Sequence, residues 1–245
     1  NYRYNNERIE LMVLYELNGK NSFALGGDLF NEAYEYKNGS DSLDITIPRS
    51  LEQNKSMFKA VYVYDNLKYD YYLLSGFKSI FNFQAVVTEN NFGDVFLIGF
   101  DDFLFFKRIG LKGNLATRIR LGIATNVDSP FAPFALDNNL NIRGVGNTID
   151  RGSASAVWNL EYRQTVLEKN WFVLQTNLFM DAGTWREAGG KLSDAFNSEV
   201  FRVYAGGGLR FMHKKIYNAI FRIDYGYGIT DEDSGGVVIG IGQYF

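Results

Sequence analysis

The chain has 245 residues, of which 46% are hydrophobic and 16% aromatic, with 25 Gly but only 3 Pro. Aromatic residues fit pleated strands and glycine serves turns, so this mixture favours strands over helices. The sequence has no Cys, which excludes disulfides and thiolate metal sites, and its net charge of −3 argues against binding nucleic acid by neutralising phosphates.

Alternation of apolar and polar residues predicts strands through the first half of the chain, beginning with residues 9–17. Residues 50–55 are polar and are predicted to form a loop, and Ser75-Gly76 is predicted to form a turn. The predicted strands of this half are 9–17, 23–32, 43–47, 57–74, 77–88, 95–106 and 115–124.

A long segment without any sustained period follows these strands. Residues 126–152 carry Pro130, Pro133 and several Asp and Asn residues. Connections of this length within a compact domain are usually functional or disordered. We therefore predict that 126–152 is a loop with a function of its own.

The clearest alternation of the chain lies in its second half. Ala154, Trp158 and Tyr162 fall on one face of a predicted strand, and Asn159 and Glu161 fall on the other. The predicted strands of this half are 154–163, 172–181, 201–211, 217–225 and 235–245. The total is about twelve strands, an even number that would place both ends of the chain on the same side.

Charged residues in the middle of strands decide between a soluble sandwich and a membrane barrel. The polar faces carry Arg118, Arg120, Glu161, Arg163, Asp181, Arg202, Arg210, Arg222 and Asp224, and the opposite faces are rich in Phe, Leu, Ile and Tyr. A polar interior with an apolar exterior explains both faces. No run of about 18 apolar residues offers a spanning helix instead. We predict one all-β domain over residues 1–245, a transmembrane antiparallel β-barrel of about twelve strands.

Three motifs in fixed order add a resemblance to a known family. They are Ile142-Arg143-Gly144 in the long loop, Gly152, Glu161 and Arg163 on the strand that follows, and Phe179, Asp181 and Gly183 on the next strand. Together they resemble the barrel of the BamA/TamA superfamily of outer-membrane assembly factors, also called the bacterial surface-antigen family. The resemblance covers residues 115–245, with Val145 in place of the family's aromatic residue. It implies a bacterial outer-membrane barrel whose long extracellular loop folds into the lumen, in a short form without POTRA domains.

The charges of these motifs have a physical reading of their own. Arg143 in a narrow lumen would be costly unless it were paired, and Glu161 and Asp181 are predicted to be inward-facing carboxylates on neighbouring strands. A guanidinium that binds a carboxylate fixes direction as well as distance. We predict a direct contact of Arg143 with Asp181 or Glu161, with Arg163, Phe179 and Gly183 as further anchoring residues. The contact either only holds the loop or also takes part in gating.

The last predicted strand is rich in glycine and ends on an aromatic residue. Its glycines are Gly235, Gly236, Gly240 and Gly242, and Phe245 follows them. Glycine weakens strand packing, so the seam between the first and last strands is predicted to be the softest pairing. The family resemblance implies that this seam opens sideways into lipid and that Phe245 belongs to an outer-membrane assembly signal. Alternatively, the glycines accommodate a close loop or the curvature of the barrel.

Enzymatic readings find little support in the sequence. No G-x-S-x-G elbow is present, and His213 is the only histidine. Asp231-Glu232-Asp233 is read as a solvated loop rather than as a calcium site. We therefore expect no enzyme, no metal and no cofactor.

The predicted function follows from the family resemblance. We expect a barrel that aids the insertion or translocation of proteins, or of lipids, at the outer membrane. The alternatives are a small anion-preferring pore, and a structural barrel that anchors a partner or a removed periplasmic domain. The expected partners are the lipid bilayer, an unfolded outer-membrane or secreted polypeptide, and the barrel-assembly machinery for its own insertion, without nucleic acid.

Overall fold

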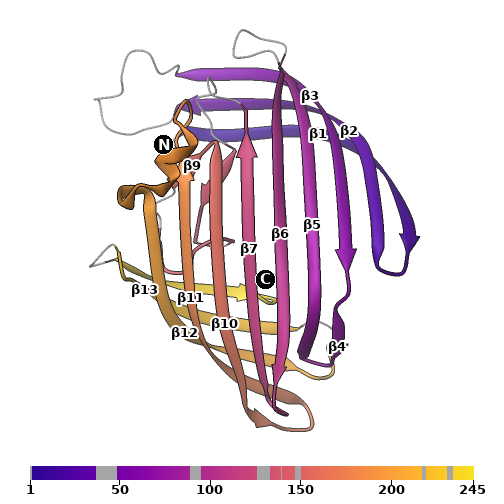
Figure 1. Cartoon of the computed structure of the whole chain (residues 1–245), viewed down its shortest axis with the longest axis vertical. Coiled ribbons are helices and arrows are strands. Elements are labelled where there is room, and N and C mark those ends of the chain that lie inside the picture. The colour runs from indigo at the N-terminus through magenta and orange to yellow at the C-terminus, as the bar shows by residue number, and fades with distance from the viewer. Residues whose placement is uncertain are drawn as a thin grey trace.

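The computed structural model describes residues 2–36, 49–88, 95–125, 133–138, 140–146, 150–216, 219–230 and 234–245. Almost all of its regular structure is β-strand, and Figure 1 shows the strands as one curved wall. The strands are β1 (Tyr2–Asn18), β2 (Asn21–Tyr36), β3 (Ser50–Asp65), β4 (Lys68–Asp70), β5 (Leu73–Thr88), β6 (Val95–Ile109), β7 (Gly113–Ala124), β8 (Phe134–Leu136), β9 (Asp150–Gly152), β10 (Ala154–Glu168), β11 (Phe172–Arg186), β12 (Phe201–His213), β13 (Ile220–Gly228) and β14 (Gly235–Ile241). Two short 3₁₀ helices, η1 (Leu192–Phe196) and η2 (Ser198–Val200), lie between β11 and β12.

The wall is a single twelve-stranded antiparallel sheet, which confirms the predicted fold class. Its order is β1-β2-β3-β5-β6-β7-β10-β11-β12-β13-β14, with β4 paired to β5 beside this path, and β8 pairs with β9 in a separate two-stranded sheet. Strands β7 and β10 are neighbours although residues 125–153 separate them in the chain. The predicted loop 126–152 is therefore a connection between adjacent strands.

The direction of the strands corrects one expectation. We call the end of the wall with the β1–β2 connection the turn end, and the end with the β7–β10 connection the loop end. β1 starts at the loop end and β14 finishes at the turn end, because the path between them holds an odd number of strands. These two strands therefore run in the same direction, and the two ends of the described chain do not lie on the same side. In the described part of the chain, β1 pairs only with β2, and β14 only with β13.

The predicted polar loop at residues 50–55 is wrong, because these residues are the start of β3. Their polar side chains face polar partners on β2. Asn31 Nδ2 donates to Asn54 Oδ1 at 2.8 Å, and Lys55 Nζ lies 2.6 Å from Glu32 Oε2. A strand on which both faces are polar at one end loses the alternation that would reveal it.

The predicted turn at Ser75-Gly76 is also misplaced. β3 ends at Asp65, the short strand β4 follows, and the chain reverses at Tyr71 and Tyr72 before β5. Gly76 lies inside β5 with a φ of +117°, which a residue with a side chain rarely adopts. Its glycine therefore marks a bend in a strand. The predicted strand 43–47, its end at Pro48 and the turn at residues 89–94 lie outside the described residues.

The two faces of the second-half strands separate as predicted. On β10, Asn159, Glu161 and Arg163 are fully buried on the inner face, whereas Trp158 on the outer face is 39% exposed. On β11, Leu178 is 70% exposed while its neighbour Asn177 is buried. Polar inner and apolar outer positions are the pattern of a membrane barrel. The described residues contain no helix that is long and apolar enough to span a membrane.

Candidate functional site

The described part of the long loop (residues 133–138 and 140–146, here called the lumen loop) packs against the inner face of the wall. Leu136 and Ile142 are fully buried and belong to an apolar cluster with Val145 and Val157 of β10. A Cβ added to Gly183 of β11 would lie 2.6 Å from Ile142 Cδ1. The lumen loop therefore packs against Gly183 too closely for a side chain at that position.

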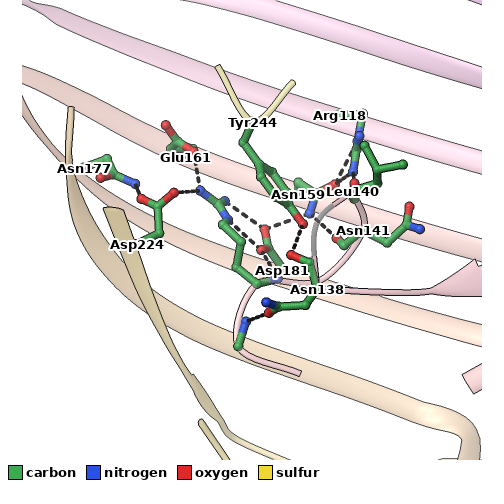
Figure 2. Close-up of polar contacts among 12 residues, drawn as sticks. Arg118, Asn138, Leu140, Asn141, Asn159, Glu161, Asn177, Asp181, Asp224 and Tyr244 are labelled. Carbon is green, nitrogen blue, oxygen red and sulfur yellow. Dashed lines mark hydrogen bonds and ion pairs between the residues drawn. The ribbon is translucent and has the colours of Figure 1, made fainter. Parts of the chain in front are cut away.

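Arg143 contacts both of the predicted carboxylates, Asp181 and Glu161, which are labelled in Figure 2. Its Nε donates to Asp181 Oδ2 at 2.8 Å, its Nη2 donates to Asp181 Oδ1 at 3.0 Å, and its Nη1 donates to Glu161 Oε2 at 2.5 Å. Its backbone N–H also donates to Asp181 Oδ2, at 3.0 Å. All three side chains are fully buried. This bidentate geometry fixes both the position and the direction of the loop tip.

A row of small residues makes room for the loop tip. In the register of the sheet, Phe179 lies beside Gly206, Gly206 beside Gly226, and Gly226 beside Gly236. A Cβ on Gly226 would lie 2.3 Å from the carbonyl oxygen of Arg143, and a Cβ on Gly236 would lie 3.2 Å from that of Gly144. The row is therefore a slot for the backbone of Arg143 and Gly144, and Gly144 itself has a φ of +99°.

The Arg143 guanidinium lies between two aromatic rings. Its Cζ is 3.7 Å from the ring centroid of Phe179 and 4.4 Å from that of Tyr244. The Tyr244 hydroxyl donates to the carbonyl oxygen of Asn138, at 3.3 Å, so Tyr244 also contacts the loop backbone. The sequence motifs do not include Tyr244, and only its even-numbered, inward position on the predicted last strand could have pointed to it.

The last strand is shorter than predicted, and this brings Tyr244 into the site. β14 ends at Ile241, and Gly242 takes a φ of +94°. Residues 243–245 then leave the sheet, so that Phe245 packs near Phe106 of β6, with ring centroids 6.5 Å apart. The prediction that the strand runs to Phe245 is therefore wrong, because the backbone at Gly242 turns the chain inward.

Each glycine of the last strand has a different close neighbour or backbone role. Gly236 faces the loop tip, whereas a Cβ on Gly240 would lie 2.8 Å from the Arg222 guanidinium and one on Gly235 would lie 2.9 Å from the Tyr225 hydroxyl. Close neighbours thus account for three of the four predicted glycines, and a turn accounts for Gly242. Gly152, at the end of β9, adjoins the carbonyl oxygen of Arg186, which a Cβ would approach to 2.5 Å.

Further buried charges extend the site toward the turn end. Arg163 Nε donates to Glu161 Oε1 at 2.6 Å, and Arg210 Nη1 lies 2.5 Å from the same oxygen. Asp224 accepts from Asn177 Nδ2 at 2.9 Å and lies 3.9 Å from Arg143 Nη1. Arg163 was predicted to anchor the loop, but it contacts Glu161 and so acts on the loop through that carboxylate.

The charge of Arg143 is secured by its surroundings. Burial would by itself lower the pKa of its guanidinium, but the hydrogen bonds to Asp181 and the charges of Asp181, Glu161 and Asp224 raise that pKa above its usual value. Arg143 is therefore a cation that its surroundings stabilise. A buried cation of this kind holds its partners firmly, since separating them would leave a charge without compensation.

Each of the six inward-facing arginines predicted to favour anions has a polar partner, although Arg163 and Arg210 also bury guanidinium nitrogens that have no hydrogen bond. Arg163, Arg210 and Arg222 pair with Glu161 or Asp224, Arg120 pairs with Asp102, Arg202 lies 3.4 Å from Asp150, and Arg118 donates to Asn159. Asp102 and Asp150 were not among the predicted carboxylates. His213 lies at the end of β12 beside Trp171, and Asp231-Glu232-Asp233 lies outside the described residues.

No family model and no curated protein matches the sequence. Solved structures match its fold. BamA from Haemophilus ducreyi lacking POTRA domains 1–3 has a TM-score of 0.71 at 13% identity, over 97% of this chain and 53% of that chain. CdiB from Escherichia coli has a TM-score of 0.66 at 12% identity, over 96% and 44% of the two chains. CdiB from Acinetobacter baumannii has a TM-score of 0.66 at 13% identity, over 99% and 43%.

These matches define the class of the fold. The chain has the transmembrane antiparallel β-barrel fold of these solved structures, as predicted, with a long loop folded into the lumen. It spans about half the length of the solved structures that it matches.

Proposed function

We propose that the protein is a barrel of the bacterial outer membrane that aids the insertion or translocation of a polypeptide. The observation that carries this proposal is the Arg143 site, in which a loop tip is held inside the lumen by Asp181 and Glu161. A loop anchored inside the lumen obstructs free diffusion through the barrel. Its similarity in fold to BamA and CdiB supports the same class of role.

The place of action in this proposal is the seam between β1 and β14. Each strand has one described neighbour in the sheet, and their outer faces are apolar and exposed, with Leu11 73% and Ile239 76% exposed. Unpaired strand edges are templates for pairing with another chain. A client polypeptide would gain backbone hydrogen bonds from either edge while its apolar side chains enter the lipid.

A reversible cross-link across the seam tests this proposal. The native chain has no Cys, so Leu11→Cys and Ile239→Cys supply the only two thiols for a cleavable bis-maleimide. The readout is the insertion of an unfolded barrel polypeptide into liposomes that contain the protein. We expect the cross-link to abolish the gain over empty liposomes, and its cleavage to restore that gain.

The matched control joins two strands that already pair. Phe221 and Ile241 are opposite each other on β13 and β14, so Phe221→Cys and Ile241→Cys can be cross-linked without closing the seam. This control should leave insertion unchanged. Full activity with the seam locked would refute opening at the seam, and no gain over empty liposomes in any state would refute the insertion role itself.

The anion-preferring pore has less support. Its motivation was an excess of inward-facing arginines, and each of these is paired with a carboxylate or an amide in the lumen. Five of the six lie beside carboxylates, which offset their attraction for a passing anion, whereas the Asn159 amide leaves the Arg118 charge uncompensated. The structural-anchor alternative predicts no insertion activity, so the same liposome measurement separates it from the proposal.

A further inference from the structure

The connection between β3 and β5 differs from the other connections at the turn end. Residues 66–75, here called the lid hairpin, consist of β4, the tip Tyr71–Tyr72 and the first residues of β5. Tyr71 has a φ of +58°, and Gly76, at the base of the hairpin, has a φ of +117°. A Cβ on Gly76 would lie 2.2 Å from the carbonyl oxygen of Asn66. The hairpin therefore bends away from the sheet at Gly76.

Hydrogen bonds across the sheet show that the hairpin bends inward. The backbone N–H of Leu74 donates to Asn114 Oδ1 at 2.9 Å, and Asn114 Nδ2 donates to the Leu74 carbonyl oxygen at 2.8 Å. Leu74 belongs to β5 and Asn114 to β7, and β6 lies between these strands in the sheet. Because Asn114 is fully buried on the inner face, Leu74 must lie over β6 on the lumen side.

The tip of the hairpin reaches still further across the wall. The Tyr72 hydroxyl donates to Glu168 Oε2, at the end of β10, at 2.9 Å, and Lys214 Nζ, just after β12, lies 5.8 Å from the centroid of the Tyr71 ring. On the sheet path, β12 is five strands from β5. Because the wall is curved, side chains of strands this far apart can meet only across the opening of the lumen. The tip thus covers part of the lumen opening at the turn end.

Charged side chains hold the tip in this place. Asp70 pairs with Arg108 of β6, and Lys214 Nζ lies 2.6 Å from the same Glu168 carboxylate that accepts from Tyr72. Burial and the hydrogen bond to Glu168 raise the pKa of Tyr72, in keeping with its hydroxyl as the donor. An open cavity of about 470 Å³ lies between the tip, Leu111 and the ends of β10 and β12.

We propose that the tip of the lid hairpin is a gate at the turn end of the lumen, latched by exposed ion pairs, while the hydrogen bonds of Leu74 to the buried Asn114 hold the base of the hairpin in place. The Asp70 and Glu168 side chains are 63% and 39% exposed. Exposed pairs contribute little and are screened by salt, so this latch releases easily. Behind it lie Thr165 and Gln175, inward-facing residues near the turn end that are 3% and 0% exposed. The gate controls access from the turn end to the buried charges around Arg143.

The rate at which a thiol reagent reaches the space behind the gate tests the proposal. Thr165→Cys, in the chain without native Cys, is the reporter, and Leu111→Cys, on an 85% exposed residue of the β6–β7 turn, is the reference. A charged maleimide is added to the folded protein in micelles. We expect Thr165→Cys to react far more slowly than Leu111→Cys at low salt, and to accelerate in about 1 M salt, where the screening length falls to about 3 Å.

A charge reversal and its compensation test the latch. Glu168→Lys places two like charges together, and we expect it to accelerate labelling of Thr165→Cys about fivefold, as the loss of a surface pair implies. Adding Lys214→Glu restores an opposite pair and should slow labelling again. Lys215→Gln removes a neighbouring exposed charge and should change nothing. Gln175→Cys is a second reporter if Thr165→Cys does not fold.

Two results would overturn the proposal. If Thr165→Cys or Gln175→Cys reacts as fast as Leu111→Cys at low salt, the hairpin does not cover the lumen. If labelling is slow but indifferent to salt and to Glu168→Lys, the ion pairs are no latch. The inference does not rest on the proposed function, because its readout is access to the lumen rather than insertion of a client.

Discussion

The lumen loop and the lid hairpin both fold inward from strand ends, but their tips are held by contacts of opposite kinds. At the loop end, Arg143 and its two carboxylates are fully buried and make four hydrogen bonds. At the turn end, the Asp70–Arg108 and Lys214–Glu168 pairs are partly exposed. Breaking a buried pair leaves a charge without compensation, whereas a broken surface pair is solvated by water. We therefore expect the lumen loop to stay in place and the tip of the lid hairpin to open.

The largest effect is expected from Arg143→Ala. It leaves Asp181 buried without its counter-charge, and the loss of one partner of a buried pair costs about 3–5 kcal/mol of unfolding free energy. We expect the urea midpoint of the protein in micelles to fall and protease to cut within residues 133–146. Arg151→Ala, which removes an exposed arginine of β9, is the matched control. Equal midpoints for the two variants would show that Arg143 does not anchor the loop.

Gly226→Ala is expected to cause the second-largest loss of unfolding free energy. Its Cβ would lie 2.3 Å from the Arg143 carbonyl oxygen, so the loop tip must move out of its slot. Overpacking of this kind costs about 1–3 kcal/mol. Gly99→Ala on β6 is the control, because a Cβ there meets nothing within 4 Å. If both alanine variants have the native urea midpoint, the glycine row is not a slot for the loop.

Tyr244→Ala should have a smaller effect. It removes one of the two rings beside the Arg143 guanidinium, and a desolvated cation–π contact contributes about 2 kcal/mol. Tyr244→Phe keeps the ring and loses only the 3.3 Å hydrogen bond to Asn138, so its urea midpoint should lie nearer the native value. A midpoint for Tyr244→Phe as low as that for Tyr244→Ala would assign the effect to the hydroxyl instead.

Lys214→Gln should have the smallest effect on stability. Surface pairs contribute about 0–1 kcal/mol, so the urea midpoint should stay close to the native one while thiol access behind the lid rises. The contrast with Arg143→Ala is the point of the measurement. A loss of stability as large as that of Arg143→Ala would make the lid hairpin a fixed part of the fold and not a gate.

Much of the wall could be predicted from the sequence because alternation survives where one face meets lipid. β7, β10 and β11 show it clearly, and their inward charges follow from it. The start of β3 escaped prediction because both of its faces are polar there, and its partners on β2 lie more than 20 residues away. The turn at Tyr71–Tyr72 was not predicted because tyrosines are also common in the strands around it. Gly76 was predicted to be the turn instead, because glycine is typical of turns.

Only the motif residues of the candidate site could be predicted from the sequence. Arg143, Glu161 and Asp181 come from three segments whose order identified them, and their contacts follow from burying opposite charges together. Tyr244 lies beyond the end of β14, and the row of Gly206, Gly226 and Gly236 depends on register across three strands, which alternation does not determine. The inward turn at Gly242 depends on a positive φ angle, which an alternating sequence pattern does not indicate.

The central claim is that Arg143 is held in the lumen by Asp181, and a double-mutant cycle tests it most directly. The unfolding free energy is measured for Arg143→Met, Asp181→Leu and the double variant, with apolar side chains replacing the buried charges. Residues in one buried network show coupling of about 0.5–3 kcal/mol. We predict a coupling of about 2 kcal/mol or more, with the double variant more stable than the sum of the single losses implies. Simple additivity would contradict the claim.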